Sequence, residues 1–82
     1  MKSNKKHPIT TLEGGGYRYT LVAVTRGEDT LYTISATDGD EIREMLESFT
    51  DNACLAEAYL TLLAHNAIDP RRMGEVWEDM LA

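Results

Sequence analysis

Two histidines and one cysteine are the side chains of this chain best suited to act as a base or a nucleophile. A catalytic triad needs a nucleophile, a base and an acid that orients the base. His7 lies near the N-terminus and His65 lies near the end of a helical pattern, and neither has a recognisable partner. Cys54 falls in an apolar helical run, where a reduced thiol behaves as a small hydrophobe. The sequence therefore predicts a protein that is not an enzyme.

Three other patterns resemble ligand sites without meeting their requirements. Residues 38–41, "DGDE", lack the alternating oxygen ligands and the distal glutamate of a calcium loop. The glycine run at 14–16 opens a predicted strand, whereas a phosphate-binding loop follows a strand and opens a helix. Glu75, Glu78 and Asp79 are neighbouring carboxylates on a predicted helix, where the usual role is a solvated surface. We expect no catalytic residue, no metal ion and no cofactor.

Strand patterns come first along the chain. Residues 17–25 and 30–36 are rich in β-branched and aromatic residues and flank a turn, which predicts an antiparallel hairpin. Tyr19 and Leu21 share one face of the first strand, while Val22 and Val24 share the other, so that both faces are partly apolar. A stable sheet needs a further strand or a covering helix, and residues 9–13 are a candidate edge strand.

Three helical patterns follow the strands. The first covers residues 37–49, where Asp38 is a candidate N-cap and Glu41 completes a capping box. Its apolar residues recur at the spacing of one helical face: Ile42, Met45, Leu46 and Phe49. The second covers residues 50–67 and is apolar on most sides, which predicts that Leu60 and Leu63 lie in the core. The sheet and two flanking helices in a monomer, or a second copy of the chain, would cover it.

The third pattern, residues 69–81, combines a clear helix start with an unfavourable arrangement of charges. Asp69 can cap the free amides, and Pro70 suits the first helical position. A helix favours acids in its first turn and bases in its last, yet here arginines come first and acids last. One explanation is that the arginines pair with Glu44 or Glu47 of the first helix. The other is a charged protein-binding surface formed by Arg71, Arg72, Glu75, Glu78 and Asp79.

The predicted fold class is α+β, because the strands precede the helices without alternation. We expect an N-terminal antiparallel sheet of two or three strands, arranged as a hairpin or meander, packed on three C-terminal helices. Residues 1–8 are predicted to be a flexible tail, and residues 9–82 a single domain. The 82 residues suffice for one hydrophobic core and for no second unit.

The C-terminal stretch "DPRRMGEVWEDML" resembles the closing segment of a family of short uncharacterised bacterial proteins, a domain of unknown function. That segment typically runs Ser-Pro-x-His-Leu-x-Asp-Val-Val-Glu-Asp-Phe-Leu. Residues Pro70, Val76, Glu78, Asp79 and Leu81 match it. Arg72 replaces the usual histidine of the family, so no role that needs an imidazole carries over to this position. The resemblance covers the last fifth of the chain well and implies a fold without an activity.

The charge distribution bears on the class of partner. The net charge is −6, and most acids lie in residues 37–82, so that this half repels nucleic acid and favours basic partners. The N-terminal residues carry neither a signal peptide nor a membrane span, and we expect a cytoplasmic protein without membrane or direct nucleic-acid contacts. The favoured function is a non-enzymatic protein-interaction or regulatory module, binding a partner or itself as a homodimer through its acidic helices, the arginine pair or a strand edge. The alternative is an acidic inhibitor that mimics nucleic acid, like anti-restriction and anti-CRISPR proteins.

Overall fold

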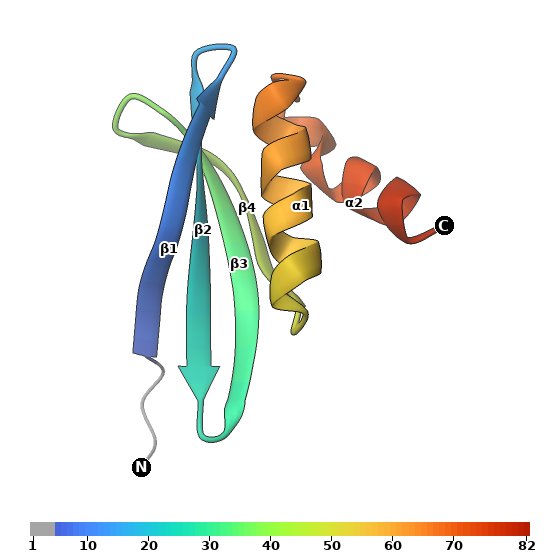
Figure 1. The fold of residues 1–82 in the computed structure, drawn as a ribbon. Helices are drawn as coiled ribbons and strands as arrows, with labels where there is room; N and C mark the ends of the chain where they lie inside the picture. The colour runs from blue at the N-terminus through green and yellow to red at the C-terminus, as the bar shows by residue number, and fades with distance from the viewer. Residues whose placement is uncertain (1–4) are drawn as a thin grey trace.

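The computed structural model describes residues 5–82, which form an antiparallel sheet followed by helices. The four strands are joined in sequence order as a meander: β1 (Lys5–Gly14), β2 (Tyr17–Arg26), β3 (Asp29–Asp38) and β4 (Glu41–Thr50). After the sheet come α1 (Ala53–His65), the 3₁₀ turn η1 (Pro70–Arg72) and α2 (Met73–Leu81). Both helices lie on the same side of the sheet (Figure 1). The molecule therefore has one helical layer and one sheet layer.

The prediction of a two- or three-stranded sheet packed on three helices is wrong, although the α+β class and the β2–β3 hairpin are confirmed. The sheet has four strands, and the segment predicted as the first helix is strand β4. Gly39 has φ 64° at the first position of the two-residue turn between Asp38 and Glu41. A glycine with positive φ at this position is the pattern of a type II′ hairpin turn. This turn sends the chain back along β3, so that Asp38 is the end of a strand and not a helix cap.

Two irregularities in β4 explain why its sequence resembles a helix. Thr37 pairs with Ile42 and Ala36 pairs with Glu44, so one extra residue is inserted in β4. A second register shift follows, where Ser48 has φ 47° and its amide donates to the Thr33 hydroxyl at 2.9 Å. Such bulges interrupt the two-residue alternation of a strand. The apolar residues of β4 consequently fall at helical spacing.

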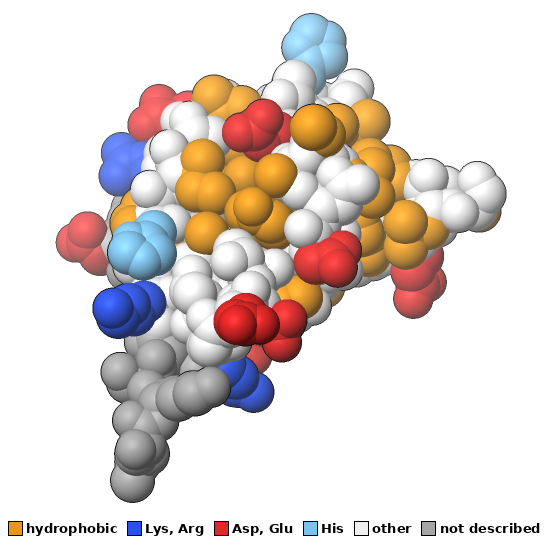
Figure 2. Space-filling view, turned by 60° about the horizontal axis from the view of Figure 1, so that its bottom comes forward, with side chains coloured by type: hydrophobic (Ala, Val, Ile, Leu, Met, Phe, Trp, Pro, Cys, Tyr) orange, Lys and Arg blue, Asp and Glu red, His pale blue; other side chains and the backbone are white. Residues whose placement is uncertain are grey.

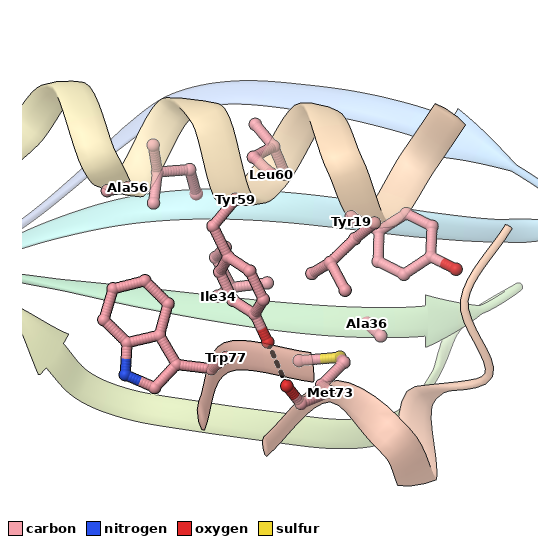
Figure 3. Close-up of a cluster of buried hydrophobic side chains, with 10 residues drawn as sticks. Tyr19, Ile34, Ala36, Ala56, Tyr59, Leu60, Met73 and Trp77 are labelled. Carbon is pink, nitrogen blue, oxygen red and sulfur yellow. Dashed lines mark hydrogen bonds between the residues drawn. The ribbon is translucent and has the colours of Figure 1, made fainter. Parts of the chain in front are cut away.

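The core lies between the sheet and the helices (Figure 3). Tyr19 and Leu21 of β2 and Ile34 of β3 are fully buried, and Leu60 and Leu63 of α1 are 1% and 0% exposed, as predicted. An aromatic cluster joins three elements: the Phe49 ring of β4 lies 5.3 Å from the Tyr59 ring and 4.7 Å from the Trp77 ring, between centroids. Edge-to-face contacts of this kind stabilise beyond simple burial. This cluster fixes α2 against both α1 and β4.

The ends of the helices differ from the apolar helical pattern of the sequence. Cys54 is exposed, because it lies in the first turn of α1 and not in the apolar interior of the helix. Leu81 is 58% exposed at the end of α2. After α1 the left-handed conformation is adopted by Ala67, with φ 47°.

The N-terminal segment was predicted to be a flexible tail over residues 1–8. Residues 1–4 lie outside the described part of the chain. From Lys5 onward the chain belongs to β1, where Lys5 pairs with Thr25 and Lys6 with Val24.

Candidate functional site

The helices cover one side of the sheet and leave the opposite side, here called the open face, without a covering layer (Figure 1). Side chains alternate between the two sides of a strand, so Val22 and Val24 lie opposite the buried face that carries Leu21. The register extends the open face across β3 and β4. Its paired residues include Val22 with Thr33, Val24 with Leu31, Ser35 with Met45, and Thr37 with Ile42.

The open face gathers much of the exposed apolar surface. Five large hydrophobic side chains are exposed in the described residues, and three of them lie on this face: Leu31 at 36%, Ile42 at 60% and Met45 at 38%. Val22 and Val24 are partly buried between them. Single exposed hydrophobic residues are common, but a contiguous group on one surface marks an interaction site.

A shallow hollow of about 240 Å³ crosses this face. Its lining comes from all four strands: Lys6, Val22, Val24, Arg26, Thr33, Ser35, Met45, Glu47 and Ser48. The floor consists of valine, threonine and serine, which are short and leave room for side chains of a partner. The open face is therefore concave, with a mildly apolar floor and charged residues at its margin.

Both edges of the sheet carry features that oppose pairing with another strand. In β1, Lys5, Lys6 and Pro8 lie close together, and the register shifts between Pro8 and Thr10. Lysines, prolines and bulges are the devices by which natural proteins block strand addition. β4 contains the two register shifts described above and several charged residues. The strand edge considered from the sequence is thus a poorer docking surface than the open face.

Three charged residues line the hollow: Arg26 lies at the end of β2, while Lys6 and Glu47 lie on opposite edge strands. Lys6 belongs to β1 and Glu47 to β4, which are the two edge strands of the sheet. Both side chains line the same hollow. Within residues 5–82 the ion pairs include neither of them. Each is therefore available to an oppositely charged group on a partner.

The five residues predicted as a protein-binding surface lie on the other side of the molecule, and all are exposed. Arg71 and Arg72 belong to η1, and Glu75, Glu78 and Asp79 belong to α2. Because α2 begins only at Met73, the arginines precede the helix, and Glu75 is the acid of its first turn. The reversed charges are thus confined to the end of α2.

The arginines form local ion pairs and do not pair with Glu44 or Glu47. Nη2 of Arg71 lies 3.0 Å from Oδ2 of Asp69, and Nε of Arg72 lies 3.6 Å from Oε2 of Glu75. Asp69 also accepts the backbone amide of Arg71 at 2.9 Å, so it caps this segment as predicted. The hydrogen bonds from the side chain and the backbone of Arg71 lower the pKa of the Asp69 carboxyl from its usual value of 3.8. The arginine and carboxylate side chains at this helix start are therefore already paired with one another.

A second hollow, of about 360 Å³, lies beside this cap. It is lined by Tyr17, Asp38, Arg43, Asp69, Pro70 and Arg71. Arg43 pairs with Asp38 and with Glu41 at 3.3 and 3.1 Å, and Arg71 pairs with Asp69. Since both guanidinium groups already contact carboxylates, an anion would have to displace them. This hollow is a weaker candidate site than the open face.

The described residues give no sign of a metal centre, because no cluster of three or more His, Cys, Asp or Glu side chains occurs among them. The most strongly perturbed ionisable group is Tyr59, whose pKa is raised by burial above its usual 10.0. Its hydroxyl donates to the Met73 carbonyl oxygen at 2.5 Å, as the dashed line in Figure 3 marks. This phenol is a structural group of the core, with a hydrogen-bond partner and no access to solvent.

Comparison with known proteins adds no relative. A scan against models of protein families finds no match, and searches of curated proteins and of solved structures find none either. The described part of the chain also has no helix that is long and apolar enough to cross a membrane. The candidate site therefore depends on the geometry of the open face.

Sequence reasoning missed this face because it assigned β4 to a helix. In that assignment Ile42 and Met45 were core residues, whereas both are exposed on the sheet. A signal was nevertheless present in β2, where Val22 and Val24 make the second side of the strand apolar. A strand with two apolar faces in so small a domain indicates that both faces have something to pack against.

Proposed function

We propose that this protein is a small non-enzymatic interaction module that binds a protein partner on the open face of its sheet. The observation that carries the proposal is the apolar row along the open face, which runs from Leu31 and its partner Val24 through Val22 and Met45, which line the same hollow, to Ile42 at the far end. Burying such a group releases water from apolar surface, at about 25 cal/mol per Å² removed. The guarded edges of β1 and β4 favour contact through the face of the sheet over strand addition.

The alternative of a nucleic-acid mimic places the binding surface on the acidic residues. A mimic of a phosphate backbone needs closely and regularly spaced negative charges. Figure 2 shows one face of the molecule on which the Asp and Glu side chains are dispersed, with hydrophobic side chains near the centre. This dispersion supports the interaction module over the mimic.

Site-specific photo-crosslinking in the cells that make the protein tests the proposal. A photoreactive amino acid replaces Val24 on the open face, and matched variants carry it at Ala53 or Glu78 on the helical side. We expect a discrete protein adduct from position 24 and none from position 53. Adducts from position 78 alone would move the site to the charged surface of α2. Equal adducts from positions 24 and 53, or an adduct to nucleic acid at position 24, would overturn the proposal.

A further inference from the structure

We infer that the occupant of the open face is a second copy of this chain, stacked sheet on sheet around a two-fold axis parallel to the strands. This inference rests on the proposed function, because it names the partner of the same face. Three observations on the face support it: the positions of its charges, the size of its side chains and its area.

The charges are complementary to themselves under this symmetry. A two-fold axis along the strands places β1 of one copy over β4 of the other, and the reverse. Lys6 of β1 is level with Val24, which pairs with Leu31, and Glu47 of β4 follows Leu46, which pairs with Ile34. The two residues are therefore offset along the strands by about two residues, roughly 7 Å, a distance that the long Lys and Glu side chains can span. Each Lys6 then faces Glu47 of the other copy, and two reciprocal ion pairs form.

The side chains in the middle of the face suit the close approach of two sheets. Stacked sheets pack about 10 Å apart with interdigitating side chains. Val22, Val24, Thr33 and Ser35 are short, and they form the floor of the hollow. Met45 also lines the hollow and is long enough to reach the facing sheet, and Leu31 pairs with Val24 of the lining.

The area is sufficient for a specific dimer. Each strand has ten residues. At about 3.3 Å per residue and about 4.8 Å between strands, four such strands present roughly 600 Å². Two copies would bury roughly 1,200 Å², the lower end of the range for specific interfaces. The predicted dimer is thus weak to moderate in affinity and depends on concentration.

Sedimentation velocity on the full chain over a range of concentrations tests the inference. We expect the wild type to shift from the 9.2 kDa monomer to twice that mass as concentration rises. Lys6→Glu and Glu47→Lys should each raise the dissociation constant roughly tenfold, because each creates two like-charge contacts per dimer. The Lys6→Glu/Glu47→Lys double variant should return to within about threefold of wild type, since it restores both pairs in reverse.

Mixing the two single variants gives a sharper measurement. A labelled Lys6→Glu chain and an unlabelled Glu47→Lys chain together form two oppositely charged pairs, whereas each variant alone forms none. We expect the mixture to associate more tightly than either chain alone. Failure of both the mixture and the double variant to recover association would overturn the inference, as would a wild type that stays monomeric throughout. Circular dichroism confirms that each variant is folded.

A third variant separates this inference from the proposed function. Val22→Glu puts a charge in the centre of the face, and Ala58→Glu is its matched control on an exposed position of α1. We expect only Val22→Glu to abolish dimerisation. A folded Val22→Glu chain that still dimerises would overturn the inference. A wild-type monomer whose position 24 crosslinks to a different protein would refute the second copy while leaving the interaction module in place.

Discussion

At the scale of single residues, Tyr59 connects the two helices. It projects from α1, is fully buried and donates a hydrogen bond to the carbonyl oxygen of Met73, the first residue of α2. Its ring also lies 5.1 Å from that of Trp77, between centroids. Tyr59 therefore contributes one polar and one aromatic contact to the position of α2.

Replacing Tyr59 with phenylalanine should isolate the polar contact. The ring contacts remain, and we expect a loss of about 0.5 to 1.5 kcal/mol in the free energy of unfolding, the usual net value of one hydrogen bond. Urea denaturation measures it. Tyr32→Phe is the control, because the Tyr32 hydroxyl has no hydrogen-bond partner among residues 5–82 and the residue is only partly buried. Equal losses in the two variants would contradict the role of the hydrogen bond.

The raised pKa of Tyr59 leads to a prediction of how the stability of the protein changes at alkaline pH. Burial raises the pKa of Tyr59, and burial together with the nearby Tyr17 and Asp69 raises that of Tyr19, both above 10.0. At a pH below the pKa that these phenols have in the unfolded chain, they are neutral in both the folded and the unfolded state, and their contribution to the free energy of unfolding is fully present. At higher pH the phenols of the unfolded chain ionise first, so the free energy of unfolding falls as the pH rises toward the pKa of the folded state. We expect the urea midpoint to fall between pH 9 and 11 by a larger amount in the wild type than in Tyr59→Phe.

At the scale of elements, the contact between the β1–β2 turn and α1 is very close. A Cβ atom on Gly14 would lie 2.0 Å from the carbonyl oxygen of Ala64, near the end of α1. Backbone atoms cannot move aside as a flexible side chain can. Gly14 therefore permits the turn to pack on the helix, and the glycine run has a structural role that its position in the sequence did not reveal.

We expect Gly14→Ala to reduce stability by about 1 to 3 kcal/mol, as overpacking typically does. Gly74→Ala is the matched control. Apart from its chain neighbours and the backbone of its own helix, no atom lies within 4 Å of its added Cβ, and the residue lies in α2, where alanine is favoured over glycine by up to about 1 kcal/mol. The first variant should thus lower and the second raise the thermal midpoint. A neutral Gly14→Ala would show that α1 does not pack on the turn in this way.

At the scale of the whole molecule, the open face and the charged surface of η1 and α2 are separate. Arg71 and Arg72 lie on the helical side, each beside a carboxylate, while Lys6 and Glu47 lie at the margin of the open face. The Cα atoms of the molecule extend over 39 × 33 × 18 Å. The sheet layer and the helical layer lie between the two surfaces. Changes to one surface should leave binding at the other intact.

Reversing Arg71 and Arg72 to glutamate tests this independence. We expect a modest fall in the thermal midpoint, because the new acids face Asp69 and Glu75, and an unchanged dissociation constant for the dimer. Calorimetry and sedimentation give the two quantities. Loss of self-association would contradict the assignment of the dimer to the open face. The protein-binding surface predicted around these arginines gains support if the variant instead loses a crosslinked partner at position 78.

The sequence alone determined the elements whose signals are local. The hairpin of β2 and β3 follows from alternation and a short turn, and α1 from its continuous helical periodicity. The cap at Asp69 and the buried positions of Leu60 and Leu63 were predicted for the same reason. In each case neighbours within one element carry the information.

Only the tertiary structure decided what β4 is and what it exposes. Its bulges place apolar residues at helical spacing, and pairing with β3, a partner outside the segment, is what selects the strand. With β4 in the sheet, Ile42 and Met45 become part of an uncovered face, and Glu47 comes to lie across the sheet from Lys6. These residues are far apart in sequence, so their common surface arises from strand order and register, which no local pattern encodes.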